Sequence, residues 1–454
     1  MHSSTRLYLP MVMVLLVWIV LGIFSILLPG LTWGNRGLMA VVTALAVFVP
    51  SYTTFSSKTA TVTMAVLSIM LGVGVILNAY CFTAYSGGTP TDPVLNNIDF
   101  YRWWNDAIYH IGDDEGTKAT ANFGFYGYIL AGILRIFGKT VGTALIWSML
   151  LMLTSVLVVG ALTYKITQTR IQAALGMICF SSVCYMLSMG TFILKDAFVI
   201  LAFAIAAYGL NCRKFRFLFL VLLSALMILM SRRNFLLPLI LGIGIISFRR
   251  GNRKFAVIGA IIIFIIWFVP QFYGYNAGLD QLVTTDVVMG VRFDSPQQMA
   301  LYKIIGDYSQ LSIIKKILLL PLTATVQFFI PFPWNFTRDF DGGFTMLYAH
   351  ISYLWYIFGF IAMYFFVSRW RDFFNPIYLT AIFGVICWLI PAFLFAGTIS
   401  RYGLCAVALM APAVAQILYN NLKSRKFYTW FATYAVVVCV VLLVAHHLQM
   451  AAMQ

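Results

Sequence analysis

Carboxylates and cations in largely apolar surroundings are the residues of this sequence best suited to chemistry. The aromatic stretch at residues 99–110 begins with the carboxylate Asp99, and isolated cations follow much later in the chain. A carboxylate can take the proton from an attacking hydroxyl, and cations can neutralise a departing phosphate. We therefore expect Asp99 to be a general base. The cations expected to bind phosphate are Lys195, Arg232, Arg233, Arg338 and Arg401.

Aromatic and polar residues near these charges are candidates for binding the other reactant. Aromatic side chains such as these suit the head-group zone of a membrane, where a lipid-linked substrate presents its polar part. The residues expected to bind the polar part of the substrate or its acceptor are Tyr101, Arg102, Trp103, Trp104, Asp106 and Tyr402. Two alternatives stay open. Asp99 could cap its own short helix, and each cation could reach the interface or pair with a nearby aspartate.

Composition indicates the elements that must position these residues. The chain of 454 residues is 62% hydrophobic and 10% charged, and its mean hydropathy is +0.91. Apolar runs near the length needed to cross a bilayer recur along it. We expect an all-α, polytopic transmembrane bundle that forms one integral membrane domain over residues 1–454, with about 13 crossings. The expected crossings are residues 10–28, 37–55, 60–80, 141–163, 171–189, 195–210, 216–230, 235–248, 255–272, 346–367, 374–395, 401–419 and 428–446.

Basic clusters between these runs predict the orientation. They include Lys165 with Arg170, and Arg213 with Arg216, and the positive-inside rule places such clusters in the cytoplasm. All of them fall on one side if residues 123–137 and 314–333 form interfacial helices that do not cross. The N-terminus is then cytoplasmic, and nearly all carboxylates lie in or beside outer loops, chiefly residues 81–122 and 273–345. The net charge of +16 follows from this rule and predicts no nucleic-acid partner.

The order of these features resembles the GT-C superfamily of polytopic glycosyltransferases, including the dolichyl-phosphate-mannose-dependent transferases. That family has an aspartate early in the first large outer loop, a tyrosine and an alanine on an interfacial helix, and a second interfacial segment ending in Phe-Gly. A later basic–acidic pair and an Arg-Tyr pair fit the same pattern. The matching positions are Asp99, Tyr101 or Tyr109, Ala107, Phe137-Gly138, Lys195-Asp196 and Arg401-Tyr402.

The resemblance implies a glycosyltransferase of the bacterial cytoplasmic membrane. It would move a sugar from a polyprenyl-linked phosphate donor to a lipid or glycan acceptor at the outer face, in the assembly of cell-surface glycans. An O-antigen or capsule repeat-unit polymerase is an alternative, because such enzymes share the layout and the long outer loop. A flippase for lipid-linked saccharides is an alternative of another class. It is disfavoured because the expected crossings carry almost no charge.

The sequence predicts no firm cofactor. Asp339 and Asp341 could offer oxygen ligands to a divalent cation, Mg²⁺ or Mn²⁺. The sequence contains no phosphate-binding P-loop, dinucleotide fingerprint or zinc motif, which argues against an ATP-driven pump. The seven cysteines are single and show no metal-binding or redox spacing.

Overall fold

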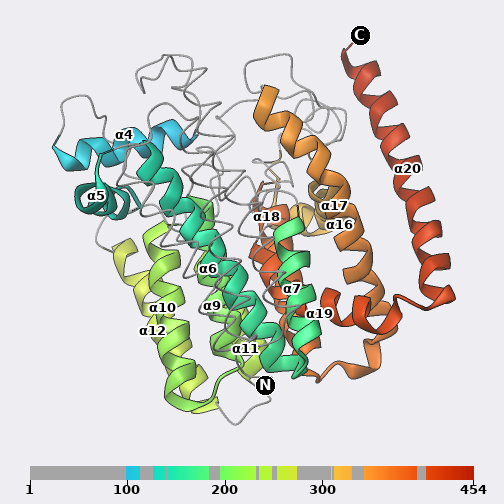
Figure 1. The fold of residues 1–454 in the computed structure, drawn as a ribbon, viewed down its shortest axis with the longest axis horizontal. Coiled ribbons are helices and arrows are strands. Elements are labelled where there is room, and N and C mark those ends of the chain that lie inside the picture. Colours follow the sequence, from blue (N-terminus) through green and yellow to red (C-terminus); the bar gives the residue numbers. More distant parts are fainter. Residues whose placement is uncertain are drawn as a thin grey trace, which may run out of the picture. The chain divides into compact units, whose positions relative to one another are not determined.

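The computed structural model describes residues 99–112, 126–139, 141–183, 195–231, 235–247, 253–272, 308, 311–329, 342–395 and 405–453. Over these residues the chain forms thirteen α-helices and no strand, which confirms the predicted all-α class (Figure 1). The chain divides into two compact units, residues 1–232 and residues 233–454. Each unit is described by itself.

The described part of the first unit consists of six helices. They are α4 (Asp99–Ile111), α5 (Tyr126–Phe137), α6 (Val141–Thr167), α7 (Arg170–Ser182), α9 (Lys195–Leu210) and α10 (Lys214–Ser231). Helix α4 packs on α5, α6 packs against α5, α7 and α9, and α10 packs on α9. Helix α9 is apolar on all sides after its first turn and is buried over nearly its whole length, as expected for a helix without a polar face.

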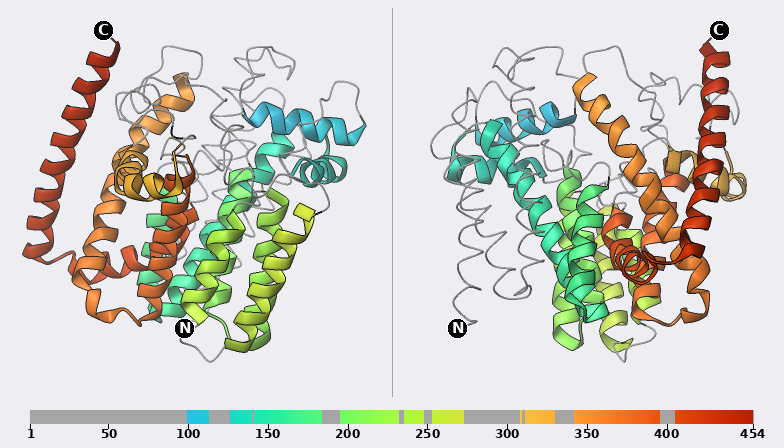
Figure 2. Two further views of the ribbon diagram at one scale, coloured as in Figure 1. Left: turned by 180° about the vertical axis from the view of Figure 1, so that it is seen from behind. Right: turned by 45° about the vertical axis from the view of Figure 1, so that its right-hand side comes forward.

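The two ends of this unit differ in chemistry. At one end Lys165 donates to Cys212 Sγ at 3.1 Å and lies 4.7 Å from the centre of the Tyr208 ring. The C-terminal ends of α6 and α9 therefore meet there, beside the exposed cations Arg170, Arg213 and Arg216. Helix α4 and the N-terminal ends of α6 and α9 lie at the opposite end (Figure 2). The 27 residues of α6 separate the two ends by about 40 Å.

The second unit is arranged around α18. Its helices are α11 (Leu236–Ser247), α12 (Arg253–Phe272), α16 (Ile313–Phe329), α17 (Gly342–Ser368), α18 (Pro376–Phe395), α19 (Cys405–Asn421) and α20 (Arg425–Met453), with a 3-10 turn at Trp370–Asp372. Helix α18 contacts α11, α16 and α19, and α17 packs on α19. Aromatic rings join α16, α17 and α20. Trp355 and Tyr356 donate to the carbonyls of Phe328 and Phe329, and Tyr434 donates to the carbonyl of Tyr356.

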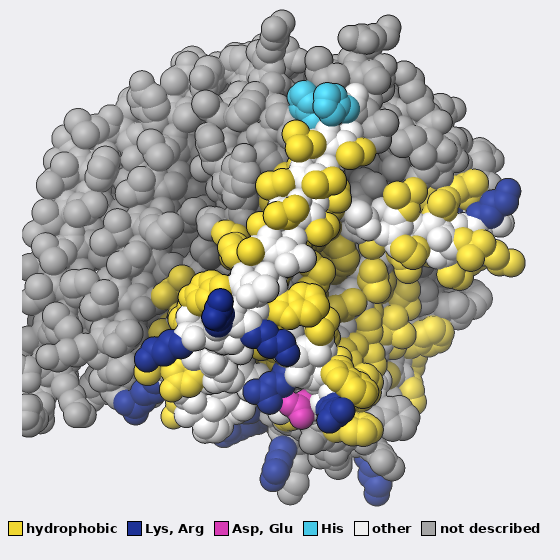
Figure 3. All heavy atoms as spheres, turned by 90° about the vertical axis from the view of Figure 1, so that its right-hand side faces the viewer, with side chains coloured by type: hydrophobic (Ala, Val, Ile, Leu, Met, Phe, Trp, Pro, Cys, Tyr) yellow, Lys and Arg dark blue, Asp and Glu magenta, His cyan; other side chains and the backbone are white. Residues whose placement is uncertain are grey.

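Helix α20 shows how this unit distributes its side chains (Figure 3). Exposed valines and leucines run along the helix, and His446 and His447 lie towards its C-terminal end. Figure 3 shows Lys and Arg side chains gathered at the opposite end of the same face from the histidines. Cations of the sequence around the start of α20 and in the turn between α17 and α18 are Arg369, Arg371, Lys423, Arg425 and Lys426. Arg369 pairs there with Asp372 at 3.2 Å. The second unit thus also has one basic end.

The predicted segments agree closely with the described helices. The segment 195–210 coincides with α9, and the ends of α10, α11 and α12 differ from the predicted segments by at most two residues. The segment 428–446 lies inside the longer α20. The expected interfacial segments 123–137 and 314–333 contain α5 and most of α16. The expected crossings 10–28, 37–55 and 60–80 lie outside the described residues.

The lengths of the described helices support fewer membrane crossings than the overall composition predicts. Within the described residues, two stretches are long and apolar enough to cross a bilayer, Leu150–Thr167 of α6 and Arg425–His447 of α20. Other described helices are apolar over shorter stretches of 10–17 residues. Length and composition alone are weak evidence of a span, because buried helices of soluble proteins pass the same test. The number of crossings therefore stays a prediction.

Candidate functional site

Helix α4 presents one buried face to the first unit. Trp103, Asp106 and Ala107 are at most 4% exposed, whereas Tyr109 on the other side of the helix is 42% exposed. Residues three and four positions apart share a helix face, so this spacing produces a single inward stripe. A tryptophan and a carboxylate thereby enter the interior together, against α5 and α9.

Asp106 lies directly on the backbone of α5. A Cβ atom at Gly127 would overlap the carboxylate of Asp106, so only glycine leaves room for it. His110, one turn further along α4, places Nε2 3.4 Å from Asp106 Oδ1. The His110 ring stacks on Tyr128 of α5, with ring centres 3.6 Å apart. The contact between α4 and α5 is therefore polar and closely fitted at its centre.

The end of α4 is held by α5. Arg135 donates to the carbonyl of His110 at 2.8 Å and approaches that of Ile111 at 3.4 Å. Gly112 follows with φ +91° and donates its amide to the carbonyl of Tyr109. A positive φ after the last turn and a cation at the final carbonyls both stabilise a helix C-terminus. The orientation of α4 is thus fixed at its C-terminal end.

The first turn of α9 brings charge to this place. Lys195 and Asp196 are 8% and 5% exposed. The Lys195 ammonium lies 4.6 Å from the centre of a Trp103 ring, a cation–π contact that offsets part of the cost of burial. Trp103 in turn meets Tyr126 of α5 edge to face, with ring centres 5.5 Å apart. Helices α4, α5 and α9 therefore meet through an ammonium and two aromatic rings.

Polar groups of α6 complete the cluster around Tyr126. Burial, and then the nearby Asp196 carboxylate, raise the pKa of the Tyr126 phenol, while Ser148 and Trp147 oppose the rise. Ser148 and Trp147 are thus within reach of the phenol and lower its pKa as hydrogen-bonding neighbours, although none of the three groups makes a hydrogen bond of good geometry in this arrangement. A phenol is already neutral at physiological pH, and the raised pKa keeps Tyr126 neutral in more alkaline solution as well. We call Trp103, Tyr126, Trp147, Ser148, Lys195 and Asp196 the polar cluster.

A second group of polar residues lies in the second unit. Tyr308 donates to the carbonyl of Phe393 at 2.8 Å, and the buried Lys316 lies 5.3 Å from the centre of its ring. Burial raises the pKa of Tyr308 to about 12. Gln327 donates to the carbonyl of Trp388 at 3.0 Å. These contacts hold α16 against the C-terminal half of α18, and this structural role is enough to explain the polar residues.

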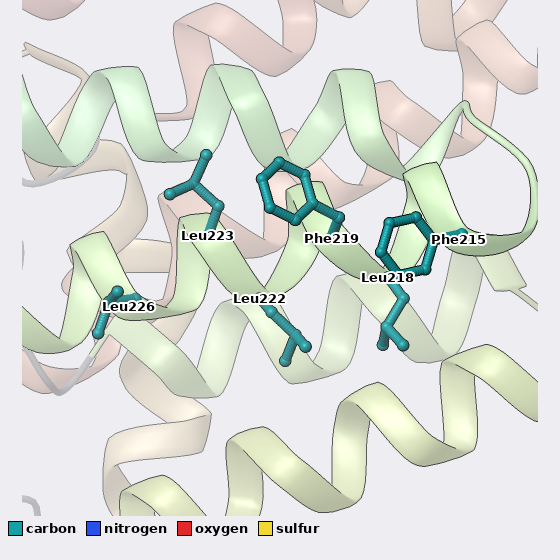
Figure 4. Close-up of a pocket in the computed structure, with 6 residues that line it drawn as sticks. All are labelled: Phe215, Leu218, Phe219, Leu222, Leu223 and Leu226. Atoms are coloured by element: carbon teal, nitrogen blue, oxygen red, sulfur yellow. The ribbon is translucent and has the colours of Figure 1, made fainter.

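A shallow groove elsewhere in the first unit carries no polar chemistry. It is formed along α10 by side chains that are all apolar (Figure 4). They are Phe215, Leu218, Phe219, Leu222, Leu223 and Leu226. Such a surface suits contact with lipid tails and offers no group for proton transfer or charge stabilisation. The polar cluster is the better candidate for a functional site.

Comparison with known proteins yields no assignment. The chain matches no protein-family model, no curated protein and no solved structure. Arguments about function therefore rest on the geometry of the described residues.

The structure brings some of the predicted site residues together. Trp103 and Lys195 touch, and Asp106 is buried on the same face of α4, while Trp104 is buried beside them in sequence. Residues 99, 101 and 102 belong to the first turn of α4, but the positions of their side chains lie outside the description. The other predicted residues lie outside the described residues altogether: Arg232, Arg233, Arg338, Arg401, Tyr402, Asp339 and Asp341. Among the described residues no group of His, Cys, Asp or Glu could hold a metal ion.

Sequence reasoning missed the contributions of α5 and α6. Tyr126 stands in the glycine- and tyrosine-rich start of the interfacial segment, and Trp147-Ser148 interrupt the apolar run 141–163. Polar residues inside an expected span are a recognised signal of a functional position. The signal was present in the sequence, but it did not show which residues Trp147 and Ser148 would contact. Those contacts depend on the rotation of α6 about its axis.

Proposed function

We propose that this chain is a polytopic membrane glycosyltransferase of the GT-C type. It transfers a sugar from a polyprenyl-linked phosphate to a lipid or glycan acceptor at the outer face of the cytoplasmic membrane. The observation that supports this most directly is the buried Lys195-Asp196 pair, packed against aromatic rings at the end of the first unit that lies opposite the basic cluster around Lys165 and Arg213. Buried charge is costly to keep and is typical of functional sites in membrane proteins.

Two observations support a membrane location: the exposed apolar surface of α20 and the position of the basic clusters. Helix α20 is only about 11% buried over its apolar window and exposes valines and leucines on several sides. Exposed apolar side chains of this density suit lipid. In each unit one end carries a cluster of cations, which fits a cytoplasmic face under the positive-inside rule. The clusters are Arg170, Arg213 and Arg216 in the first unit and Arg369, Arg371, Lys423, Arg425 and Lys426 in the second. The proposal retains about 13 crossings, with helices α5 and α16 at the outer interface and the N-terminus inside.

The chemistry assigns roles to the charges. The ammonium of Lys195 binds the phosphate of the donor, together with Arg232, Arg233, Arg338 and Arg401. Asp99, at the start of the helix that carries Trp103 and Asp106, takes the proton from the acceptor hydroxyl. The bond between the sugar and the phosphate oxygen breaks while the acceptor oxygen bonds to the sugar, and the polyprenyl phosphate leaves. Cations near the departing phosphate lower the barrier because charge develops there.

Aromatic rings and carboxylates have a separate task in this proposal. Trp103, with Tyr101, Trp104 and Tyr402, provides flat apolar faces for the sugar. Asp106 and Arg102 orient hydroxyl groups of the sugar or acceptor by hydrogen bonds. The position of α4 is therefore important, because one rigid helix carries both the base and much of the sugar site.

The test is transfer by the purified full chain. The protein in detergent receives a panel of radiolabelled polyprenyl phosphates, each bearing one hexose, N-acetylhexosamine or pentose, together with a lipid extract as acceptor source. We expect one donor to label a new product, and Asp99→Asn to reduce the rate by at least about 100-fold, the scale of a lost general base. Asp372→Asn, at the basic end of the second unit, is the matched control and should keep the rate.

Detergent solution also separates an enzyme from a flippase. A transferase forms the product without any second compartment, whereas a flippase only redistributes its lipid across a sealed vesicle. Transport across proteoliposomes without any product in detergent would reject the proposal. Full activity of Asp99→Asn would remove Asp99 from the mechanism while leaving the reaction class intact.

A further inference from the structure

Three buried polar groups of the polar cluster have no hydrogen bond to satisfy them within the described part of the chain. They are the Tyr126 hydroxyl, the indole N–H of Trp147 and the Ser148 hydroxyl. Tyr126 and Ser148 are 0% exposed. A buried polar group without a partner costs about 1–3 kcal/mol, and proteins rarely keep several such groups in one place without a use.

Their chemistry defines the atom that would satisfy them. An indole N–H can only donate, so the group that meets Trp147 must accept a hydrogen bond. The Tyr126 and Ser148 hydroxyls can donate or accept. The carboxylate of Asp196 is close enough to Tyr126 to raise its pKa, and it disfavours an anion at the same place. A neutral group that both accepts and donates fits these conditions.

We infer that Tyr126, Trp147 and Ser148, beside Asp196, form a subsite for a hydroxyl group of the donor sugar. This inference rests on the proposed function and specifies part of its substrate recognition. The phosphate of the same donor lies towards Lys195, which Trp103 separates from Tyr126. The Tyr126 ring is held between Trp103 and Phe198, so its hydroxyl is fixed before the sugar arrives. Fixed donors that pair only with a hydroxyl discriminate strongly against a ligand that lacks it.

Two measurements test the subsite, and the first needs no ligand. Tyr126→Phe and Ser148→Ala each remove a buried hydroxyl that has no described partner. We expect the melting temperature of the purified full chain to stay unchanged or to rise. The matched controls are Tyr164→Phe and Ser155→Ala on α6, where Ser155 donates to the carbonyl of Leu151 at 2.8 Å. A fall in melting temperature for Tyr126→Phe and Ser148→Ala as large as that for Ser155→Ala, which loses a hydrogen bond, would show structural hydrogen bonds and overturn the inference.

The second measurement compares two probes by quenching of tryptophan fluorescence. One probe is polyprenyl phosphate without a sugar, and the other is the same lipid carrying the sugar that the wild type prefers in the panel above. We expect Tyr126→Phe and Ser148→Ala to lose about tenfold in affinity for the sugar-bearing lipid, on the scale of one hydrogen bond, and to bind the bare lipid as the wild type does. Tyr164→Phe and Ser155→Ala should bind both probes normally.

The outcomes distinguish the subsite from the proposed function. If the wild type prefers the sugar-bearing lipid and both variants keep that preference, the subsite is wrong while the glycosyltransferase proposal stands. If the wild type binds neither lipid, or binds both equally, the donor class is wrong and the subsite is rejected with it. Equal loss of affinity for both lipids would place Tyr126 and Ser148 at the phosphate and also overturn the inference.

Discussion

At the scale of single residues, the contact between Asp106 and Gly127 sets how closely α4 approaches α5. The carboxylate occupies the space that a Cβ would need at position 127. The same carboxylate faces His110, whose ring stacks on Tyr128. A change in side-chain size at this contact should therefore shift α4 relative to α5. Because α4 carries Trp103, the shift should also reach the polar cluster.

Gly127→Ala tests this contact. The added methyl group must displace the carboxylate, so we expect a loss of roughly 1–3 kcal/mol in the free energy of unfolding, the cost of overpacking. Gly132→Ala on the same helix has open space around its Cβ and should be neutral or gain up to about 1 kcal/mol from helix propensity. Thermal unfolding of the detergent-solubilised chain measures both. Combined with Asp106→Ala, Gly127→Ala should cost less than it does alone, and simple additivity would contradict the proposed contact.

Lys195 carries a second prediction at this scale. Lys195→Met keeps the apolar stem against Trp103 but removes the ammonium, so we expect affinity for polyprenyl phosphate to fall roughly 10- to 100-fold, the scale of a lost charged hydrogen bond. Lys139→Met removes an exposed cation from the same unit and should leave affinity unchanged. The affinity of each variant for polyprenyl phosphate is measured by quenching of tryptophan fluorescence. An equal effect of the two substitutions would mean that Lys195 acts only through overall charge.

At the scale of elements, α5 serves as the support on which α4 is oriented. It supplies Gly127 beneath Asp106, Tyr128 beneath His110, and Arg135 at the last carbonyls of α4. Gly138, with φ +107°, ends α5 and donates its amide to the carbonyl of Leu134. The short α5 therefore combines a defined end with several contacts to one face of its neighbour.

Arg135→Ala should loosen the end of α4. The substitution removes a cation from the helix C-terminus, which is typically worth about 0.3–1 kcal/mol. We expect amide hydrogen exchange at residues 109–112 to become severalfold faster, with little change in α6 or α9. Lys139→Ala, also exposed and near the end of α5, is the control. Unchanged exchange in Arg135→Ala would show that the packing of Asp106 and His110 alone holds this end of α4.

At the scale of the molecule, each unit separates its charges between two ends. In the first unit Lys165, Arg170 and Arg213 lie far from Lys195, with α6 and α9 between them. In the second unit the cations around Arg371 and Lys423 gather where α17, α18, α19 and α20 meet. The proposed membrane location predicts such a separation, because the positive-inside rule keeps clusters of cations on the cytoplasmic side.

Single cysteines test this topology. In a variant without its seven natural cysteines, we expect Tyr109→Cys and Lys315→Cys to react with a membrane-impermeant maleimide on intact spheroplasts. Arg170→Cys, Arg213→Cys and Lys423→Cys should react only after permeabilisation. Reaction of Tyr109→Cys and Arg170→Cys under the same condition would contradict the proposed orientation of the first unit. Different sidedness for Tyr109→Cys and Lys315→Cys would reject only the crossing count between them.

Local features of the sequence determined the helical class and most helix bounds. An apolar run of 16 residues such as 195–210 is too long for a typical strand and predicts a helix, and the turn at Arg213 between two such runs ends one helix and begins the next. The basic clusters could also be located from the order of residues along the chain, and the side of the membrane that the positive-inside rule assigns to them stays a prediction. The sequence placed Lys195 and Trp103 in one predicted site without predicting that they touch, and in the structure the Lys195 ammonium lies 4.6 Å from the centre of the Trp103 ring.

Only the tertiary structure decided which polar groups face one another. Whether Trp147 and Ser148 turn towards Tyr126 or away from it depends on the rotation of α6 about its axis and on its crossing with α9. These quantities are set by packing between helices distant in sequence, and no window of residues contains them. The same holds for Asp106 and Gly127, whose fit exists only once α4 lies across α5.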